Sequence, residues 1–251
     1  MKRILRFELM KIWHPFSFIY WILFSIAFIV FSYDEPSFIK RFMSSNFRYN
    51  EEIIINIFYF ASYYKYLLTL FIIYITSREF ANNTIIRSIY EGFSRKELFV
   101  GKLAVLAILT LFVFLLTRII LMVLFLVKGY SFNTISFMLL NYHFVIAELF
   151  SCFSLGLFGI MLSSLVKNLY WSIGLFIAWG YFEYLLQMVS FMTPFQEMAN
   201  YLPLYMMTTI YRSLRFNEFG LLQFFYLFTL QQLFLLVIYN QYNHITWLRK
   251  H

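Results

Sequence analysis

Long apolar runs separated by short polar segments make up most of the chain. A helix needs about 20 mainly apolar residues to cross the hydrocarbon core of a bilayer. Runs of roughly this length or longer set the predicted elements, and they cover residues 16–32, 53–76, 103–127, 135–166, 169–191 and 219–241. The pattern therefore predicts an all-α integral membrane protein with six transmembrane helices.

Composition leads to the same prediction. Of the 251 residues, 62% are hydrophobic and only 13% are charged. A soluble domain of this length has no core large enough to bury so many apolar side chains, and exposing them to water favours aggregation. We expect the bilayer to surround most of the protein, and residues 1–251 to form a single transmembrane domain.

The distribution of charge predicts the orientation in the membrane. Six spans put both termini on one face, where cations outnumber acids, whereas the two balance on the other face. Because cytoplasmic loops are enriched in Lys and Arg, both termini are predicted to face the cytoplasm of a multi-pass protein in the plasma (bacterial cytoplasmic) membrane. The net charge of +8 is spread over short loops, which argues against nucleic acid as a partner.

The cytoplasmic connection at residues 77–102 is the most informative polar segment. Gly92 suits the left-handed position that follows a helix end. Ser94 and Glu97 have the spacing of a capping box that begins the next helix. An apolar ridge at helical spacing is predicted from Ile86, Ile89, Tyr90 and Phe93. Such a ridge suits docking in a groove of another protein, and the alternative is packing on the bilayer surface or on the chain's own helices.

This segment and the N-terminus also carry a family resemblance. Glu79-Phe80-x-x-x-Thr84, followed by Gly92-x-Ser94-Arg95 and then Gly101-Lys102, resembles the cytoplasmic loop of ABC-2 type transporter permeases. The N-terminal Glu8-Leu9-Met10-Lys11-Ile12 is similar to the start of the same family. One departure is Phe93, which stands where a Pro or Leu often precedes the Ser-Arg pair.

The resemblance implies a permease subunit of an ATP-driven exporter that works by alternating access. It implies an interfacial helix at residues 1–14, a coupling helix at residues 77–92, and a half-buried outer hairpin at residues 192–217, which Pro194 and Pro203 interrupt. The implied partners are an ABC ATPase dimer and a second permease copy or paralogue. The residues assigned to contact with the ATPase are Glu79, Phe80, Thr84, Ile86, Arg87, Ile89, Tyr90, Phe93, Ser94 and Arg95.

No ATP-binding motif is present in the chain itself. Gly101-Lys102 lacks the earlier glycine that a phosphate-binding loop of the form G-x-x-x-x-G-K-[ST] requires. ATP and Mg are therefore expected on the partner ATPase, with no cofactor on this chain. The sequence does not name the cargo, although short loops and little hydrophilic lining favour a lipid-like, peptide or amphipathic drug molecule.

Four charges fall inside the predicted spans. Lys65, Arg118, Glu148 and Glu183 lie on the second to fifth runs, each about 20–28 Å from the cytoplasmic end of its helix at 1.5 Å per residue. Isolated charges are unfavourable in hydrocarbon, so mutual neutralisation is one interpretation. The other is contact with a polar or charged group of the cargo along the translocation path.

Candidate chemistry for an enzyme is weak. The four histidines (His14, His143, His244 and His251) are dispersed, Cys152 is the single cysteine, and no serine has the context of a nucleophile. We therefore predict no catalytic residue and no metal site. Two alternatives to a transporter stay open: a non-transporting membrane anchor or sensor for an ABC ATPase, and an intramembrane enzyme built on the four charges.

Overall fold

The computed structural model describes residues 2–12, 21, 50–127, 142–190, 202–204 and 221–244. All regular structure in these residues is helical, which confirms the all-α prediction for this part of the chain. The helices are α1 (Lys2–Ile12), α4 (Asn50–Ala81), α5 (Thr84–Tyr90), α6 (Arg95–Val127), α8 (Tyr142–Val166), α9 (Leu169–Ser190) and α12 (Leu221–His244).

Two helices among the described residues are long and apolar enough to cross a bilayer. They are Arg95–Ile120 within α6 and Val145–Val166 within α8. Large apolar side chains are also exposed along the outer faces of α6 and α9, including Ile119 and Tyr181. Extended exposed apolar surface of this kind marks a membrane or protein interface, and it supports association with a membrane.

Several predictions concern residues outside the described part of the chain. The first predicted span, residues 16–32, is described only at Trp21, and the outer connection at residues 192–217 only at residues 202–204. The remaining five apolar runs coincide with α4, α6, α8, α9 and α12 over their described residues. Six spans therefore stay a prediction, with helical structure confirmed for five of the runs.

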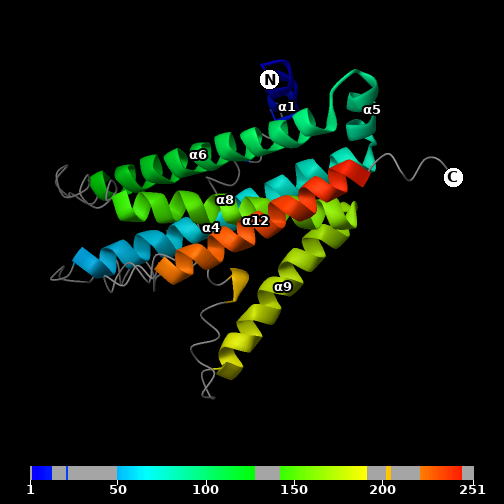
Figure 1. The fold of residues 1–251 in the computed structure, drawn as a ribbon. Helices are drawn as coiled ribbons and strands as arrows, with labels where there is room; N and C mark the ends of the chain where they lie inside the picture. The colour runs from blue at the N-terminus through cyan, green and yellow to red at the C-terminus, as the bar shows by residue number, and fades with distance from the viewer. Residues whose placement is uncertain are drawn as a thin grey trace.

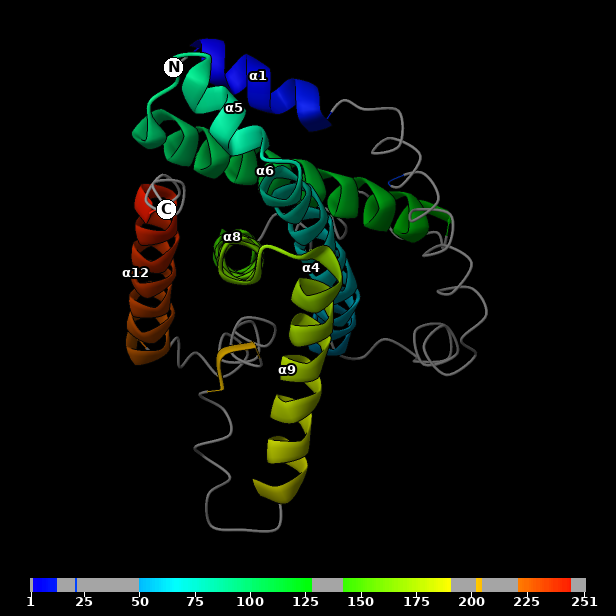
Figure 2. The same cartoon turned by 90° about the vertical axis from the view of Figure 1, so that its right-hand side faces the viewer.

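The long helices α4, α6, α8 and α12 run side by side, with α8 between the other three (Figures 1 and 2). The C-terminal ends of α4, α8 and α12 lie together with α5 and the N-terminal ends of α6 and α9 (Figure 1). We call this the α5 end of the bundle. Helix α1 lies across α6 at this end. Helix α9 begins at this end and diverges from the bundle toward its own C-terminus (Figure 2).

Small residues allow α4 and α8 to approach closely. A β-carbon on Gly159 of α8 would lie 3.2 Å from the backbone oxygen of Thr69 on α4. One turn further, the hydroxyl of Ser163 donates to the Gly159 carbonyl at 2.9 Å and lies 3.4 Å from that of Ile73. Larger side chains at these positions would separate the helices, so the small residues fix the centre of the bundle.

The segment between α4 and α6 differs from its prediction. The resemblance implied one coupling helix over residues 77–92. Instead, α4 continues to Ala81, and a turn at Asn82 and Asn83 separates it from the next helix. Asn83 adopts the left-handed conformation with φ of 54°, a region that Asn tolerates better than most residues. The separate helix α5 therefore begins only at Thr84, and the first part of the predicted coupling helix belongs to α4.

Candidate functional site

Helix α5 ends in a Schellman motif. Gly92 has φ of 92°, and its N–H donates to the carbonyl of Ile89 at 3.1 Å. The N–H of Phe93 donates to the carbonyl of Ser88, also at 3.1 Å. These two bonds satisfy carbonyls that the helix end would otherwise leave open. The predicted left-handed role of Gly92 is confirmed.

A capping box begins α6 immediately afterwards. The backbone N–H of Ser94 donates to Oε2 of Glu97 at 2.8 Å, and the N–H of Glu97 donates back to the Ser94 hydroxyl at 3.2 Å. This reciprocal pair confirms the prediction from their spacing. Because specific hydrogen bonds define both sides of the turn at residues 91–94, α5 is held in a defined direction relative to α6.

The inner face of α5 packs against the bundle. Ile85 and Ser88 are buried, and Ile89 packs on the hydrophobic core. Phe93 is only 8% exposed, because its ring stacks on Phe7 of α1 with centroids 5.5 Å apart. The predicted ridge is therefore not one exposed surface. The assignment of Phe93 to it was wrong, because this side chain is buried. Its partner comes from a segment distant in the sequence.

The outer face of α5 is polar with one prominent aromatic ring. Tyr90 is 79% exposed, and Ile86 beside it is partly exposed. Arg87 and Glu91 form an exposed ion pair at 3.2 Å. An exposed pair of this kind contributes little to stability. Because both side chains are exposed, their charges are accessible to another molecule. We call residues 86, 87, 90 and 91 the α5 outer face.

The other residues assigned to the partner contact serve the chain's own packing. The Phe80 ring packs edge-on against Tyr242 of α12 at 6.0 Å between centroids. Nη1 of Arg95 donates to the carbonyl of Asn243 at 3.0 Å. Thr84 is partly buried at the start of α5, and exposed Ser94 is engaged in the capping box. Phe80 and Arg95 therefore connect the end of α4 and the start of α6 to the C-terminal end of α12.

A buried ion-pair cluster joins α1, α4 and α6. Nζ of Lys102 on α6 lies 2.9 Å from Oε2 of Glu8 on α1 and 2.5 Å from Oε1 of Glu79 on α4. All three side chains are buried, so the ammonium group exchanges its water for two carboxylates. We call these residues the Lys102 cluster. Glu79, assigned from the sequence to the partner contact, is 5% exposed and faces inward.

Gly101, next to Lys102, brings α1 close to α6. A β-carbon at this position would lie 3.0 Å from Cγ1 of Ile4 and 3.5 Å from Cγ of Glu8. Four of the residues quoted for the family resemblance, namely Glu8, Glu79, Gly101 and Lys102, therefore lie together, because Gly101 allows α1 to approach and Lys102 pairs with acids from α1 and α4. Sequence reasoning noted each residue but gave no signal that they were in contact.

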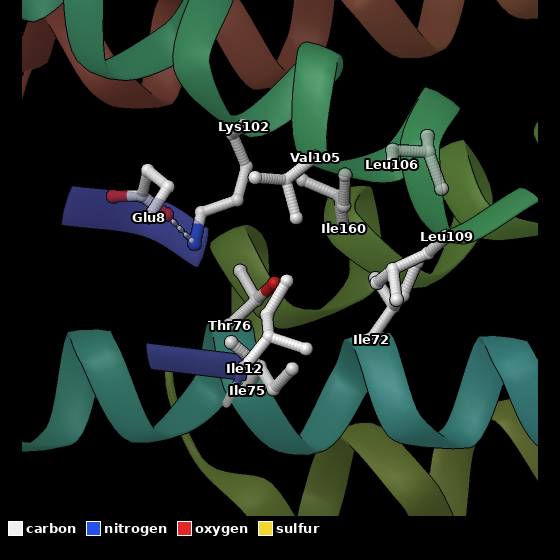
Figure 3. Close-up of a pocket in the computed structure, with 10 residues that line it drawn as sticks. All are labelled: Glu8, Ile12, Ile72, Ile75, Thr76, Lys102, Val105, Leu106, Leu109 and Ile160. Atoms are coloured by element: carbon white, nitrogen blue, oxygen red, sulfur yellow. Dashed lines mark hydrogen bonds and ion pairs between the residues drawn. The ribbon is translucent and has the colours of Figure 1, made fainter. Parts of the chain in front are cut away.

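A small pocket lies beside this cluster (Figure 3). Its empty space, open side included, is about 290 Å³. Glu8 and Lys102 form its charged end (Figure 3), and the rest is lined by Ile12, Ile72, Ile75, Thr76, Val105, Leu106, Leu109 and Ile160. Side chains of α1, α4, α6 and α8 therefore face one space beside the Lys102 cluster.

The four charges of the predicted spans do not form one network. Arg118 and Glu148 form a buried ion pair between α6 and α8. Glu183 lies apart from them and accepts hydrogen bonds from the indole N–H of Trp179 and, at 3.0 Å, from the backbone N–H of Leu204. Within the described residues, Nζ of buried Lys65 has no hydrogen-bond partner. Neutralisation therefore accounts for the first pair only.

The described residues hold no group of three His, Cys, Asp or Glu side chains arranged to bind a metal. His14 and His251 lie outside these residues, and so do the side chains of His143 and His244. Cys152 is buried in α8.

Comparison with known proteins adds no assignment. No family model matches the sequence, and no curated protein matches it. The resemblance to ABC-2 type permeases therefore stays a prediction that depends on the residues quoted for it.

Proposed function

We propose that the chain is the membrane-spanning permease subunit of an ATP-driven exporter of the ABC-2 type. The observation that carries the proposal is the construction of the α5 end. A short helix with an exposed polar and aromatic face is fixed by the caps that follow it and by its buried inner face, and the adjoining Phe93 packs on α1. An exposed surface held this firmly suits contact with a second protein, since little conformational entropy is lost on binding.

Three connections transmit a displacement of α5 to the bundle. Its C-terminal motif leads directly into α6, Phe93 joins it to α1, and Lys102 links α1, α4 and α6. Packed elements with buried ion pairs move as units. A partner that pushes on the α5 outer face therefore moves α1 and the ends of α4 and α6 together, as alternating access requires.

The proposed arrangement in the membrane has six spans and both termini in the cytoplasm. All connections at the α5 end would then be cytoplasmic, where the excess of Lys and Arg is found. An ATPase dimer would bind there with ATP and Mg, and a second permease copy or paralogue would complete the transporter. The cargo class that suits the apolar bundle is a lipid-like, peptide or amphipathic drug molecule.

Co-purification tests the partner. The chain is co-expressed with candidate ATP-binding subunits from the same genome, and the complex is isolated in detergent. We expect the double substitution Arg87→Glu and Tyr90→Ala to reduce ATPase recovery at least tenfold, because it reverses one charge and removes the exposed ring. Tyr170→Ala is the matched control, since Tyr170 is 83% exposed at the same end of the bundle on α9.

Equal ATPase recovery with the double variant and the control would refute the docking role of α5. Transport is measured separately, as ATP-dependent movement of amphipathic dyes in vesicles that contain the intact complex. Stable association without transport of any cargo would favour a membrane anchor or sensor. Transport that continues when the ATPase has lost its activity would contradict the proposal entirely.

A further inference from the structure

Helix α1 has one face turned toward the bundle and one turned away from it. Ile4 and Glu8 are one turn apart, and both are buried where α1 meets α6. Arg3, Arg6 and Met10 lie on the opposite face, because each residue of a helix is rotated by about 100° from the one before it. All three side chains are exposed, Met10 to 59%. The outward face of α1 is therefore basic and ends in an apolar side chain.

The charges of α1 leave this outward face positive. The helix contains one acid, Glu8, and four cations: Lys2, Arg3, Arg6 and Lys11. The acid is buried in the Lys102 cluster. Glu97, at the start of α6, interacts electrostatically with Arg3, but its carboxylate accepts hydrogen bonds from the backbone and hydroxyl of Ser94. The two exposed arginines can therefore bind an anion from outside the chain.

An exposed apolar stripe on α6 begins close to α1. Ile108, Leu115, Ile119 and Leu126 are exposed, and their spacings of four and seven residues place them on one face of the helix. We call these four residues the α6 stripe. Gly101, where α1 crosses α6, precedes Ile108 by seven residues and lies on the same face. Residues 108–126 span about 27 Å along the helix, which is close to the thickness of the hydrocarbon core of a bilayer, about 30 Å.

The crossing point sets the level of α1 relative to the bilayer. Gly101 lies about 10 Å along α6 from the end of the stripe at Ile108. Headgroups extend about 5–8 Å beyond the hydrocarbon core, and the long stem of an arginine lets its guanidinium group reach back toward that layer. Because α1 lies across α6 (Figures 1 and 2), its outward face runs along the membrane surface. Arg3 and Arg6 are therefore within reach of the lipid phosphates at the end of the stripe.

We propose that this face of α1 binds anionic phospholipids, with Arg3 and Arg6 on the phosphate group and the acyl chains along the α6 stripe. The inference rests on the membrane arrangement in the proposed function, and it requires neither an ATPase nor a cargo. Arg3 keeps its position 4.9 Å from the centre of the Phe93 ring, since a guanidinium group can stack on a ring and donate hydrogen bonds from its edge. A lipid matches the basic face and the apolar stripe together, whereas a soluble acidic partner matches only the first.

Binding is tested on the intact chain in nanodiscs of phosphatidylcholine, without any ATPase. Trace photoreactive phosphatidylglycerol or phosphatidylcholine is added, each with a diazirine near the start of one acyl chain, and labelled peptides are quantified by mass spectrometry. We expect the anionic probe to label α1 and the first half of α6 at least tenfold more than the zwitterionic probe, because each basic residue at a membrane surface contributes about fivefold. Equal labelling by the two probes would overturn the proposal.

Variants of the two arginines test their role. Arg3→Gln combined with Arg6→Gln should reduce labelling by the anionic probe at least tenfold and leave labelling by the zwitterionic probe unchanged. Arg3→Lys combined with Arg6→Lys should retain most of the preference. Lys96→Gln is the matched control, since Lys96 is exposed but lies about 18 Å from Ile108 along α6, beyond the headgroup layer. The same preference in the double glutamine variant as in the wild type would refute the role of these side chains.

A soluble competitor distinguishes a lipid from a free anion. Glycerol phosphate, which has the same phosphate chemistry without acyl chains, is added in large excess. Unchanged labelling would support a lipid occupant, and strong competition would assign the face to soluble anions and contradict the proposal. Loss of ATPase recovery in the double glutamine variant, with labelling unchanged, would assign the face to a partner protein instead. Because the nanodiscs contain no ATPase, failure of this inference leaves the co-purification result intact, and failure of docking at α5 leaves the labelling result intact.

Discussion

Lys102 of α6 and Glu79 of α4 form a buried ion pair, with Nζ and Oε1 2.5 Å apart. The second carboxylate at this lysine belongs to Glu8 of α1. Two buried acids share one base, so Lys102 is central to the cluster. Helices α1 and α4 are both held to α6 through Nζ of Lys102.

Removing the cation of the cluster should destabilise the protein strongly. Lys102→Met removes the cation that pairs with both Glu8 and Glu79. Breaking a buried ion pair by removing one partner typically costs about 3–5 kcal/mol. We expect a large fall in the midpoint of thermal unfolding in detergent, followed by circular dichroism.

A triple variant provides the control for this prediction. Lys102→Met combined with Glu8→Met and Glu79→Met removes every charge of the cluster while keeping side chains of similar length. Replacing a whole buried charge cluster with apolar residues is often neutral or stabilising. We expect the triple variant to recover at least half of the stability lost. A triple variant less stable than Lys102→Met would show that the charges are not what joins these helices.

Gly92 should be sensitive to substitution through its backbone alone. Its φ of 92° is disfavoured for residues with a β-carbon, and no atom lies within 4 Å of where that carbon would be. Gly92→Ala is expected to cost roughly 1–2 kcal/mol and to weaken ATPase recovery, since α5 loses its direction. Gly174→Ala, also in open space but helical, should be neutral or stabilise by about 0.5–1 kcal/mol. Equal effects at both glycines would contradict the left-handed role.

Local features of the α5 segment were predictable because their signals lie within a few residues. A left-handed glycine and a Ser–Glu capping box follow from backbone chemistry over one turn, and both formed as expected at Gly92, Ser94 and Glu97. The helical character of the apolar runs was predictable for the same reason. Composition and periodicity are properties of the sequence that do not depend on how the helices pack.

Features that depend on tertiary contact were not predictable. Phe93 was assigned to an exposed ridge because its spacing from Ile89 is helical, but Phe7 covers it. Glu79 was assigned to a partner contact, but α4 continues past residue 76, and the phase of that longer helix turns Glu79 toward Lys102. No local pattern encodes which distant side chain lies opposite, so the sequence also gave no sign that Nζ of Lys65 would lack a hydrogen-bond partner within the described part of the chain.

The close approach of α1 to α6 should depend on the missing side chain at Gly101. Gly101→Val places carbon atoms within about 3 Å of Ile4, and overpacking of this kind typically destabilises by about 1–3 kcal/mol. We expect faster amide hydrogen exchange throughout α1, with little change in α12. Gly174→Val is the matched control. Unaltered exchange in α1 would mean that Ile4 moves aside and that Gly101 is not required for this contact.

Glu148 and Glu183 should respond differently to the same substitution. Glu148→Gln removes the carboxylate that pairs with buried Arg118, and we expect a loss of about 3–5 kcal/mol with reduced folded yield. Glu183→Gln keeps an oxygen that accepts from Trp179 and Leu204, so the expected loss is about 1 kcal/mol. Arg118→Met added to Glu148→Gln should recover part of the first loss. The comparison is made by thermal unfolding together with dye transport by the intact complex. If Glu148→Gln is as stable as the wild type but transports poorly, its carboxylate acts on the cargo, and the structural interpretation of the Arg118–Glu148 pair is wrong.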